Sequence, residues 1–339
     1  MTNARDRVSR FAAIGEICLV LVVGNLVGRA LVPTLISPEL AAIADTPEAP
    51  DLLPAAGVSA LQLTARFGAM MLLGFTWLWW RSRKTPRDCG FTRSGWPLSR
   101  LLTAGVVLYA VSFLPLLLLL ISNAYLPLGA GLAEWHRDAA TLANVDFWIF
   151  VLCAAVILPP IYEELIFRGY MRERISENFG PMGAIIATAF LFSLAHGQYY
   201  AADILLTAAL ACSFFAAFCW AYLTYRCGSL LPAMVAHALT NLPIPHEPLV
   251  LFPILIASAI VILLARETIV SYLGTVLADW RGTDKGGVLL AMAVITAFVV
   301  PASVLNASAM QDEARAWGIA CLIVFGAAVG WNWRRSGGR

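Results

Sequence analysis

Charged residues are scarce in this sequence. Of 339 residues, 13% are charged and 60% are hydrophobic, and the mean hydropathy is +0.77. A soluble domain is only about 45–50% apolar, so the composition excludes a separate cytosolic catalytic domain and predicts a chain that lies in a lipid bilayer. The net charge of +2 has no strong sign, and it therefore predicts no nucleic-acid partner.

Paired cysteines are missing as well. The seven cysteines include no CxxC pair, and five of them lie in apolar runs. We interpret them as packing residues rather than as a disulfide framework or a zinc knuckle. Histidine is also rare. His136 and His246 lie in polar connections, whereas His196 and His237 lie in hydrophobic segments, where an ionisable side chain needs a partner or a function.

Hydropathy predicts an all-α fold, a polytopic transmembrane helix bundle of about ten spans within a range of eight to ten. The expected spans are 11–32, 56–80, 101–124, 147–176, 181–197, 203–225, 229–243, 247–265, 287–305 and 314–333. Segment 266–282 is mixed in polarity, so we expect it to lie as an interfacial helix between two spans.

The distribution of charge predicts the orientation of these spans. The loop after the first span carries four acidic and no basic residues, whereas the next loop carries six basic residues. By the positive-inside rule the first loop is outside and the second is cytoplasmic, and the alternation then places both termini in the cytoplasm. Glu16 and Arg66 are single charges within spans. We expect them to pair with each other or to reach toward the membrane surface.

The fourth span contains charges that a membrane helix rarely carries. Glu163, Glu164 and Arg168 follow Pro159 and Pro160 directly. Two prolines remove two backbone donors and kink the helix, so carbonyls are left that protein or water must satisfy. This pattern predicts a cavity. Glu164 and Arg168 have the spacing of an ion pair along one helix face, whereas Glu163 points about 100° away and is expected to be free.

Polar residues of three spans are expected to meet. Glu163 lies 17 residues before Gly180 and His196 lies 16 residues after it. A hairpin turn near Gly180 would therefore bring both to the same depth, roughly 25 Å from the turn. In the seventh span, His237 and Asn241 are four residues apart and share one helix face. We expect these four side chains to converge inside the membrane.

The motifs formed by these residues are those of a known family. Glu163-Glu-x-x-x-Arg168, Phe192-x-x-x-His196 and His237-x-x-x-Asn241 resemble, in order and in spacing, the three signature motifs of the CPBP family. This family comprises type II CAAX prenyl endopeptidases and bacteriocin-processing (Abi) membrane proteins. The resemblance covers roughly residues 147–243. It implies a glutamic-type intramembrane endopeptidase that hydrolyses a peptide bond of a membrane-associated or prenylated protein or peptide.

The resemblance also implies roles for the motif residues. Glu163 with His196 would activate a water molecule, and His237 with Asn241 would form the oxyanion hole. A carboxylate desolvated in an apolar cavity is a good base for water near neutral pH, so the physical interpretation agrees. This mechanism requires no serine or cysteine nucleophile, and it requires no cofactor. Glu164 would pair with Arg168 and hold the site in place.

Other functions remain open. A zinc-dependent version of the protease is an alternative, because two histidines and a glutamate are a common zinc set. The chain has no HExxH motif and Asn241 is a poor zinc ligand, so we expect no metal. A proton-coupled transporter also suits charges beside broken helices, but no repeated half is present. A catalytically silent scaffold would not need an unpaired Glu163.

We expect three regions along the chain. Residues 1–146 form N-terminal transmembrane helices, residues 147–243 the CPBP-like catalytic core, and residues 244–339 C-terminal transmembrane helices. The expected location is the bacterial inner (plasma) membrane. The expected partners are the lipid bilayer and a membrane-associated protein or peptide substrate, which we expect to enter from the cytoplasmic leaflet.

Overall fold

A computed structural model describes residues 4–36, 52–91, 95–126, 128–129, 144–196, 204–243, 247–307, 320 and 323–330. His136 and His246 lie outside these residues. The described residues form helices and no β-strand, which confirms the all-α prediction. The helices are α1 (Ala4–Leu35), α3 (Leu52–Ser82), α4 (Leu98–Tyr125), α6 (Val145–Val151), η3 (Leu152–Ile157), α7 (Leu158–Glu164), η4 (Leu165–Met171), α8 (Arg172–Ala195), α9 (Ile204–Cys227), α10 (Leu231–Thr240), α11 (Pro248–Leu264), α12 (Arg266–Arg281) and α13 (Lys285–Ala307).

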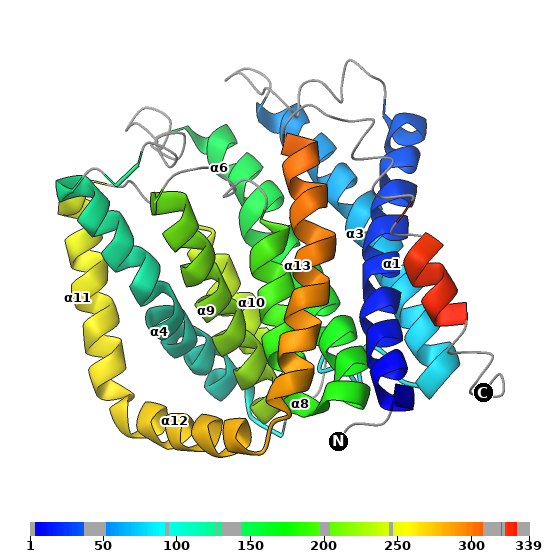
Figure 1. Cartoon of the computed structure of the whole chain (residues 1–339). Helices are drawn as coiled ribbons and strands as arrows, with labels where there is room; N and C mark the ends of the chain where they lie inside the picture. Colours follow the sequence, from blue (N-terminus) through cyan, green and yellow to red (C-terminus); the bar gives the residue numbers. More distant parts are fainter. Residues whose placement is uncertain are drawn as a thin grey trace.

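The long helices stand side by side as a bundle (Figure 1). Five helical segments of the described residues are long and apolar enough to cross a membrane, or six if the bent pair of α11 and α12 is one span. This confirms a polytopic membrane protein. Helix α10 and the apolar part of α13 (Lys285–Pro301) are shorter, so the count of ten spans and the position of the termini stay predictions.

The predicted turn at Gly180 is present and joins two antiparallel helices. Gly180 has φ 70° and ψ 170°. Glycine adopts this positive φ without strain, and the extended ψ suits a residue that precedes proline. Pro181 then begins the second helix. The rings of Phe167 and Phe192 contact each other at 5.1 Å, although they lie on opposite sides of the turn. The hairpin therefore brings the motifs of the fourth and fifth predicted spans next to each other.

Helix α12 lies across the end of the bundle at which α1 begins (Figure 1). It is bent by 75° from α11, where we expected an interfacial helix. None of its residues is buried, and Val270, Leu273 and Leu277 are more than half exposed. Their spacing of three and four residues places them on one face. This exposed apolar face is typical of a helix that lies in the membrane interface.

The expected pairing of Glu16 with Arg66 is wrong. Glu16 Oε2 accepts hydrogen bonds from Arg174 Nε at 2.5 Å and from Trp77 Nε1 at 3.2 Å, whereas Arg66 Nε donates to Asn25 Oδ1 at 3.0 Å. Helices α1 and α3 run antiparallel, so Arg66 faces a part of α1 that lies well away from Glu16. Glu16 instead stabilises Arg174, a buried residue of α8 that lies six residues before the turn at Gly180.

The largest group of buried apolar side chains lies where the central helices meet. It includes Met70 on α3, Leu108 on α4, Phe192 on α8 and Trp220 on α9. No disulfide joins the six cysteines among the described residues. The motif residues lie against this core, and its aromatic side chains form one wall of the site.

Candidate active site

The fourth predicted span is broken beside its acidic motif. Pro159 and Pro160 begin α7, and π-helical turns precede and follow α7. In a regular helix the N–H of residue 159 would bond the carbonyl oxygen of Ala155, but proline has no N–H. The Asn241 side-chain amide fills this gap, because its Nδ2 donates to Ala155 O at 2.9 Å. The prolines thus create an acceptor for an amide on α10.

Glu164 is fully buried between two basic side chains. Its Oε1 lies 3.0 Å from Arg168 NH1 and 2.9 Å from His237 Nδ1, and its side chain is 0% exposed. The predicted pair of Glu164 with Arg168 is therefore present. Because a carboxylate oxygen accepts, His237 Nδ1 donates in its bond to Glu164 and its Nε2 points elsewhere. Glu164 thereby fixes the orientation of the His237 ring.

Glu163 lies in a different environment from its neighbour. Its side chain is 19% exposed, and its Oε2 lies 3.8 Å from His237 Nε2. It also exerts the strongest electrostatic effect of any charged group on His196. Glu163 takes no part in the pair with Arg168, as predicted, and its carboxylate faces His237. The two neighbouring carboxylates approach opposite nitrogens of the same imidazole, one at hydrogen-bond distance and one beyond it.

His196 ends α8 with a fixed ring. Its Nδ1 lies 2.8 Å from the carbonyl oxygen of Phe192, and a carbonyl can only accept, so Nδ1 donates and Nε2 is the acceptor nitrogen of the neutral ring. The ring also contacts that of Phe192, with 4.6 Å between centroids. The one-turn spacing of the Phe192-x-x-x-His196 motif therefore sets both the position and the tautomer of the histidine.

Aromatic side chains enclose the basic groups of the site. The Trp220 indole stacks on the His237 imidazole at 4.7 Å with 26° between the planes. The Arg168 guanidinium lies over the Phe192 and Trp220 rings, 4.2 and 5.2 Å from their centroids. Trp220 Nε1 donates to Ser112 Oγ at 2.9 Å. The sequence analysis missed both Trp220 and Ser112. A buried indole N–H needs an acceptor, but no motif in the sequence links α9 to α4.

A cavity of about 80 Å³ opens beside the motif residues. This volume is room for more than one water molecule. Three of the predicted site residues line it, namely His196, His237 and Asn241. Ser112 and Trp220 line it as well. The structure thus brings the histidines of α8 and α10 to one small space between α4, α8, α9 and α10. Glu163 does not line this cavity, but its Oε2 lies 3.8 Å from Nε2 of His237, which does.

A metal site would need a further ligand here. In the parts of the chain that the structure describes, no three His, Cys, Asp or Glu side chains are grouped so that they could hold a metal ion. His237 Nδ1 is held by Glu164 and His196 Nδ1 by a backbone carbonyl. Zinc-ligating histidines are commonly held in this way through the ring nitrogen that does not bind the metal, so the zinc-dependent alternative stays a hypothesis and the expected absence of a metal stays a prediction.

The fold and the cavity with its polar lining residues define a class, that of polytopic membrane proteins with a polar site enclosed by helices. Comparison with known families is more specific. Residues 145–243 match the family described as type II CAAX prenyl endopeptidase Rce1-like, which agrees with the family that the motifs resemble. The match covers under a third of the chain and includes all six motif residues of the site. No curated protein and no solved structure matches the chain. The family implies a protease, which is a hydrolase that acts on a membrane-associated protein or peptide.

Proposed function

We propose that the protein is a glutamic-type intramembrane endopeptidase that hydrolyses a peptide bond of a membrane-associated or prenylated substrate. One observation carries the proposal. Glu163 and Glu164 are adjacent, yet Glu164 is completely buried and held by Arg168 and His237, whereas Glu163 is partly exposed and has no bond shorter than its 3.8 Å approach to His237 among the described residues. Two neighbouring carboxylates in different environments are suited to two different roles.

Glu163 is the proposed general base. Among the described charged groups, Glu163 has the largest electrostatic effect on His196. The Nε2 atom of His196 is an acceptor in the neutral ring, so the two groups can share the protons of one water molecule. The water oxygen forms a bond to the substrate carbonyl carbon while Glu163 takes a water proton. When the C–N bond breaks, Glu163 returns this proton to the leaving nitrogen. The products are a carboxyl group and an amine, and no oxidant or co-reactant is required.

His237 and Asn241 are the proposed donors to the oxyanion. Asn241 Nδ2 carries two hydrogens, and its bond to Ala155 O uses one of them. When His237 is protonated, Nε2 also donates. Both side chains line the cavity, and His237 Nε2 lies 3.8 Å from Glu163 Oε2. Fixed donors of this kind stabilise the charge that develops on a carbonyl oxygen. Glu164 and Arg168 act as positioning residues through the His237 ring.

The experiment compares cells that express wild type, Glu163→Gln or the control Glu267→Gln at equal protein levels. Glu267 is an exposed carboxylate at the start of α12, so the control removes one acidic group outside the site. Mass spectrometry of membrane peptides identifies the fragments. We expect Glu163→Gln to lower fragment yield by about 10²–10⁴-fold, the usual effect of losing a general base, while Glu267→Gln leaves it unchanged.

Two further arms separate the alternatives. A chelator is added to wild-type membranes. Fragments that persist support the metal-free mechanism, whereas loss of the fragments would show that the protease depends on zinc. Thermal unfolding of the solubilised variants shows whether Glu163→Gln still folds. If wild type and the folded variant yield identical peptides, the protein is not this endopeptidase, and proton-linked flux becomes the next measurement. We place the protein in the bacterial plasma membrane, which fractionation of the same cells tests.

A further inference from the structure

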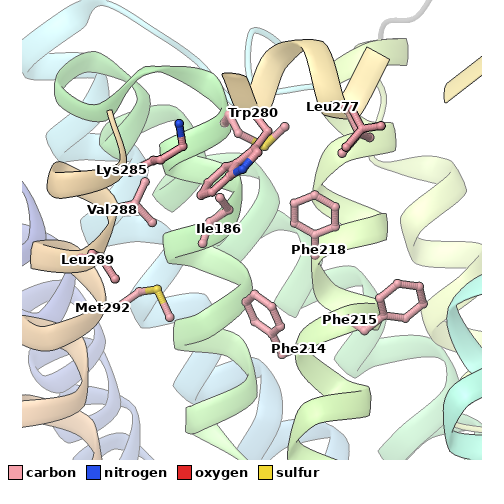
Figure 2. Close-up of a pocket in the computed structure, with 12 residues that line it drawn as sticks. Ile186, Phe214, Phe215, Phe218, Leu277, Trp280, Lys285, Val288, Leu289 and Met292 are labelled. Atoms are coloured by element: carbon pink, nitrogen blue, oxygen red, sulfur yellow. The ribbon is translucent and has the colours of Figure 1, made fainter. Parts of the chain in front are cut away.

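A second cavity lies away from the motif residues, on the side of the bundle where α8, α9, α12 and α13 meet. Its volume is about 550 Å³, within the range of about 300–1,000 Å³ that is typical of small-molecule sites. The exposed atoms of its lining are all apolar. Figure 2 shows the lining side chains, which include Ile186 of α8, Phe214 and Phe218 of α9, and Leu289 and Met292 of α13.

The two ends of this cavity differ in chemistry. Trp280 and Lys285 lie at the end next to α12, whereas Phe214, Phe215 and Met292 lie at the other end (Figure 2). The Lys285 ammonium lies 5.5 Å from the centre of the Trp280 ring. A tryptophan beside a basic residue is typical of the membrane–water interface. The apolar cavity therefore begins at an interfacial end beside the Lys285 ammonium and extends into an apolar interior.

Lys285 has a positive charge that the described part of the protein does not neutralise. The neighbouring Asp284 pairs with Arg10, and Asp279 pairs with Tyr222 and Arg226. No described carboxylate forms an ion pair with Lys285, which is itself exposed. A lysine is a common ligand for phosphate groups, so the end of the cavity next to α12 is complementary to an anionic headgroup.

Helix α12 indicates that lipid reaches this end. Its exposed apolar face includes Leu277, which also lines the cavity. An interfacial helix places such a face at the boundary between headgroups and acyl chains. We propose that the cavity binds an anionic phospholipid of the adjoining leaflet, with an acyl chain between α8, α9 and α13 and the headgroup phosphate at Lys285.

Native mass spectrometry of the full-length protein in detergent tests this proposal. The probes are dioleoylphosphatidylglycerol, which is anionic, and dioleoylphosphatidylcholine, which has the same chains and no net charge. We expect a saturable adduct with the first lipid. Lys285→Gln should weaken it by about fivefold, the effect of one basic side chain near a membrane surface. Leu289→Trp, which replaces a lining side chain by a bulky ring, should weaken the adducts of both lipids.

Matched variants control for charge and for bulk. Arg266→Gln removes one exposed positive charge from the other end of α12, and Leu264→Trp adds the same ring at an exposed position outside the cavity. Both should bind dioleoylphosphatidylglycerol as wild type does. Equal adducts in all variants would overturn the proposal. A farnesylated peptide that binds where dioleoylphosphatidylglycerol does not, or a dimer lost in Leu289→Trp, would also overturn it by assigning the cavity to a substrate anchor or to a second copy. Lipid binding is measured without proteolysis, so its outcome is independent of the proposed activity.

Discussion

The indole of Trp220 covers one face of the His237 imidazole, with 4.7 Å between the ring centroids. Glu164 holds the Nδ1 edge of the same imidazole. The Trp220 N–H is in turn held by Ser112 on α4, outside the segment that matches the family. Neither Trp220 nor Ser112 belongs to a motif, yet together they fix the plane in which His237 presents Nε2 to Glu163.

The first prediction concerns this stack. Trp220→Leu should lower the rate of peptide cleavage by about 10–100-fold, because a small displacement of a catalytic group is costly, while the KM changes little. Trp220→Phe keeps a ring and should recover part of the rate. Kinetics on the purified enzyme with a cleaved peptide measure the two parameters.

Ser112→Ala provides the matched test of the hydrogen bond. It should destabilise wild type by about 1 kcal/mol, since a buried donor loses its acceptor, but it should cost almost nothing in Trp220→Phe, which has no N–H. Thermal unfolding of the four proteins gives the coupling between the two positions. Strictly additive effects would show that the 2.9 Å contact contributes nothing.

The second prediction concerns the buried pair of Glu164 and Arg168. Arg168→Met should destabilise the protein by about 3–5 kcal/mol, because it leaves a buried carboxylate with one basic partner fewer. Adding Glu164→Gln removes that carboxylate, so the double variant should regain stability without regaining activity. Unfolding temperature and fragment yield are measured in parallel. A double variant that is less stable than Arg168→Met would contradict a charge-based account.

The third prediction separates two roles of Asn241. Asn241→Ala removes a donor from Ala155 O and should cost about 1–3 kcal/mol of stability, as well as activity. Pro159→Ala restores a backbone N–H that can reach Ala155 O. In the Pro159→Ala background the stability cost of Asn241→Ala should therefore shrink, whereas the loss of activity should remain if Asn241 stabilises the oxyanion. Equal recovery of both would limit Asn241 to a structural role.

The fourth prediction is a pH dependence at the start of α13. Hydrogen bonds from Arg10 and from the backbone N–H of Gly287 hold the pKa of Asp284 below its ordinary value of 3.8. A lowered pKa favours the folded state above the ordinary pKa, and this contribution is lost as the pH falls through the lowered value. Asp284→Asn keeps a capping acceptor but no charge, so it should be slightly less stable than wild type at pH 7.

Thermal unfolding at pH 7 and pH 3 checks the sign. The difference in Tm between wild type and Asp284→Asn should be about 1–3 °C at pH 7 and should decrease at pH 3. Asp284→Ala, which also loses the cap, should be less stable than Asp284→Asn by about 0.5–1 kcal/mol at both pH values. A difference that grows as the pH falls would reverse the assigned direction.

Local spacing predicted much of this site, whereas contacts between distant helices were not predictable. The pair of Glu164 and Arg168 follows from one helical turn, and the hairpin follows from Gly180 and Pro181. The approach of Glu163 to His237 depends instead on how α7 and α10 are rotated about their axes. The two prolines predicted unpaired carbonyls, but only the fold identifies Asn241 as the donor that satisfies one of them.

The same limit applies to the bundle as a whole. Hydropathy indicates which segments are apolar, and it predicted α12 as a separate helix. It does not give the register between α1 and α3. From the sequence, Arg66 was therefore as good a candidate partner for Glu16 as Arg174, which is the partner in the structure. A burial pattern from many related sequences would be needed to choose between them, because one apolar helix offers several faces of similar hydrophobicity.

The ion pair of Glu16 and Arg174 bears on how the protein can be dissected. Residues 145–243 match the protease family, but Arg174 inside that segment is fully buried and depends on a carboxylate from the first helix. Trp220 likewise depends on Ser112 of α4. A fragment cut at the limits of the family match would leave Arg174 with Glu177 as its carboxylate partner but without Glu16, and it would leave the Trp220 N–H without its acceptor. We therefore expect that the family segment does not fold stably on its own and that a minimal stable fragment must retain α1 and α4.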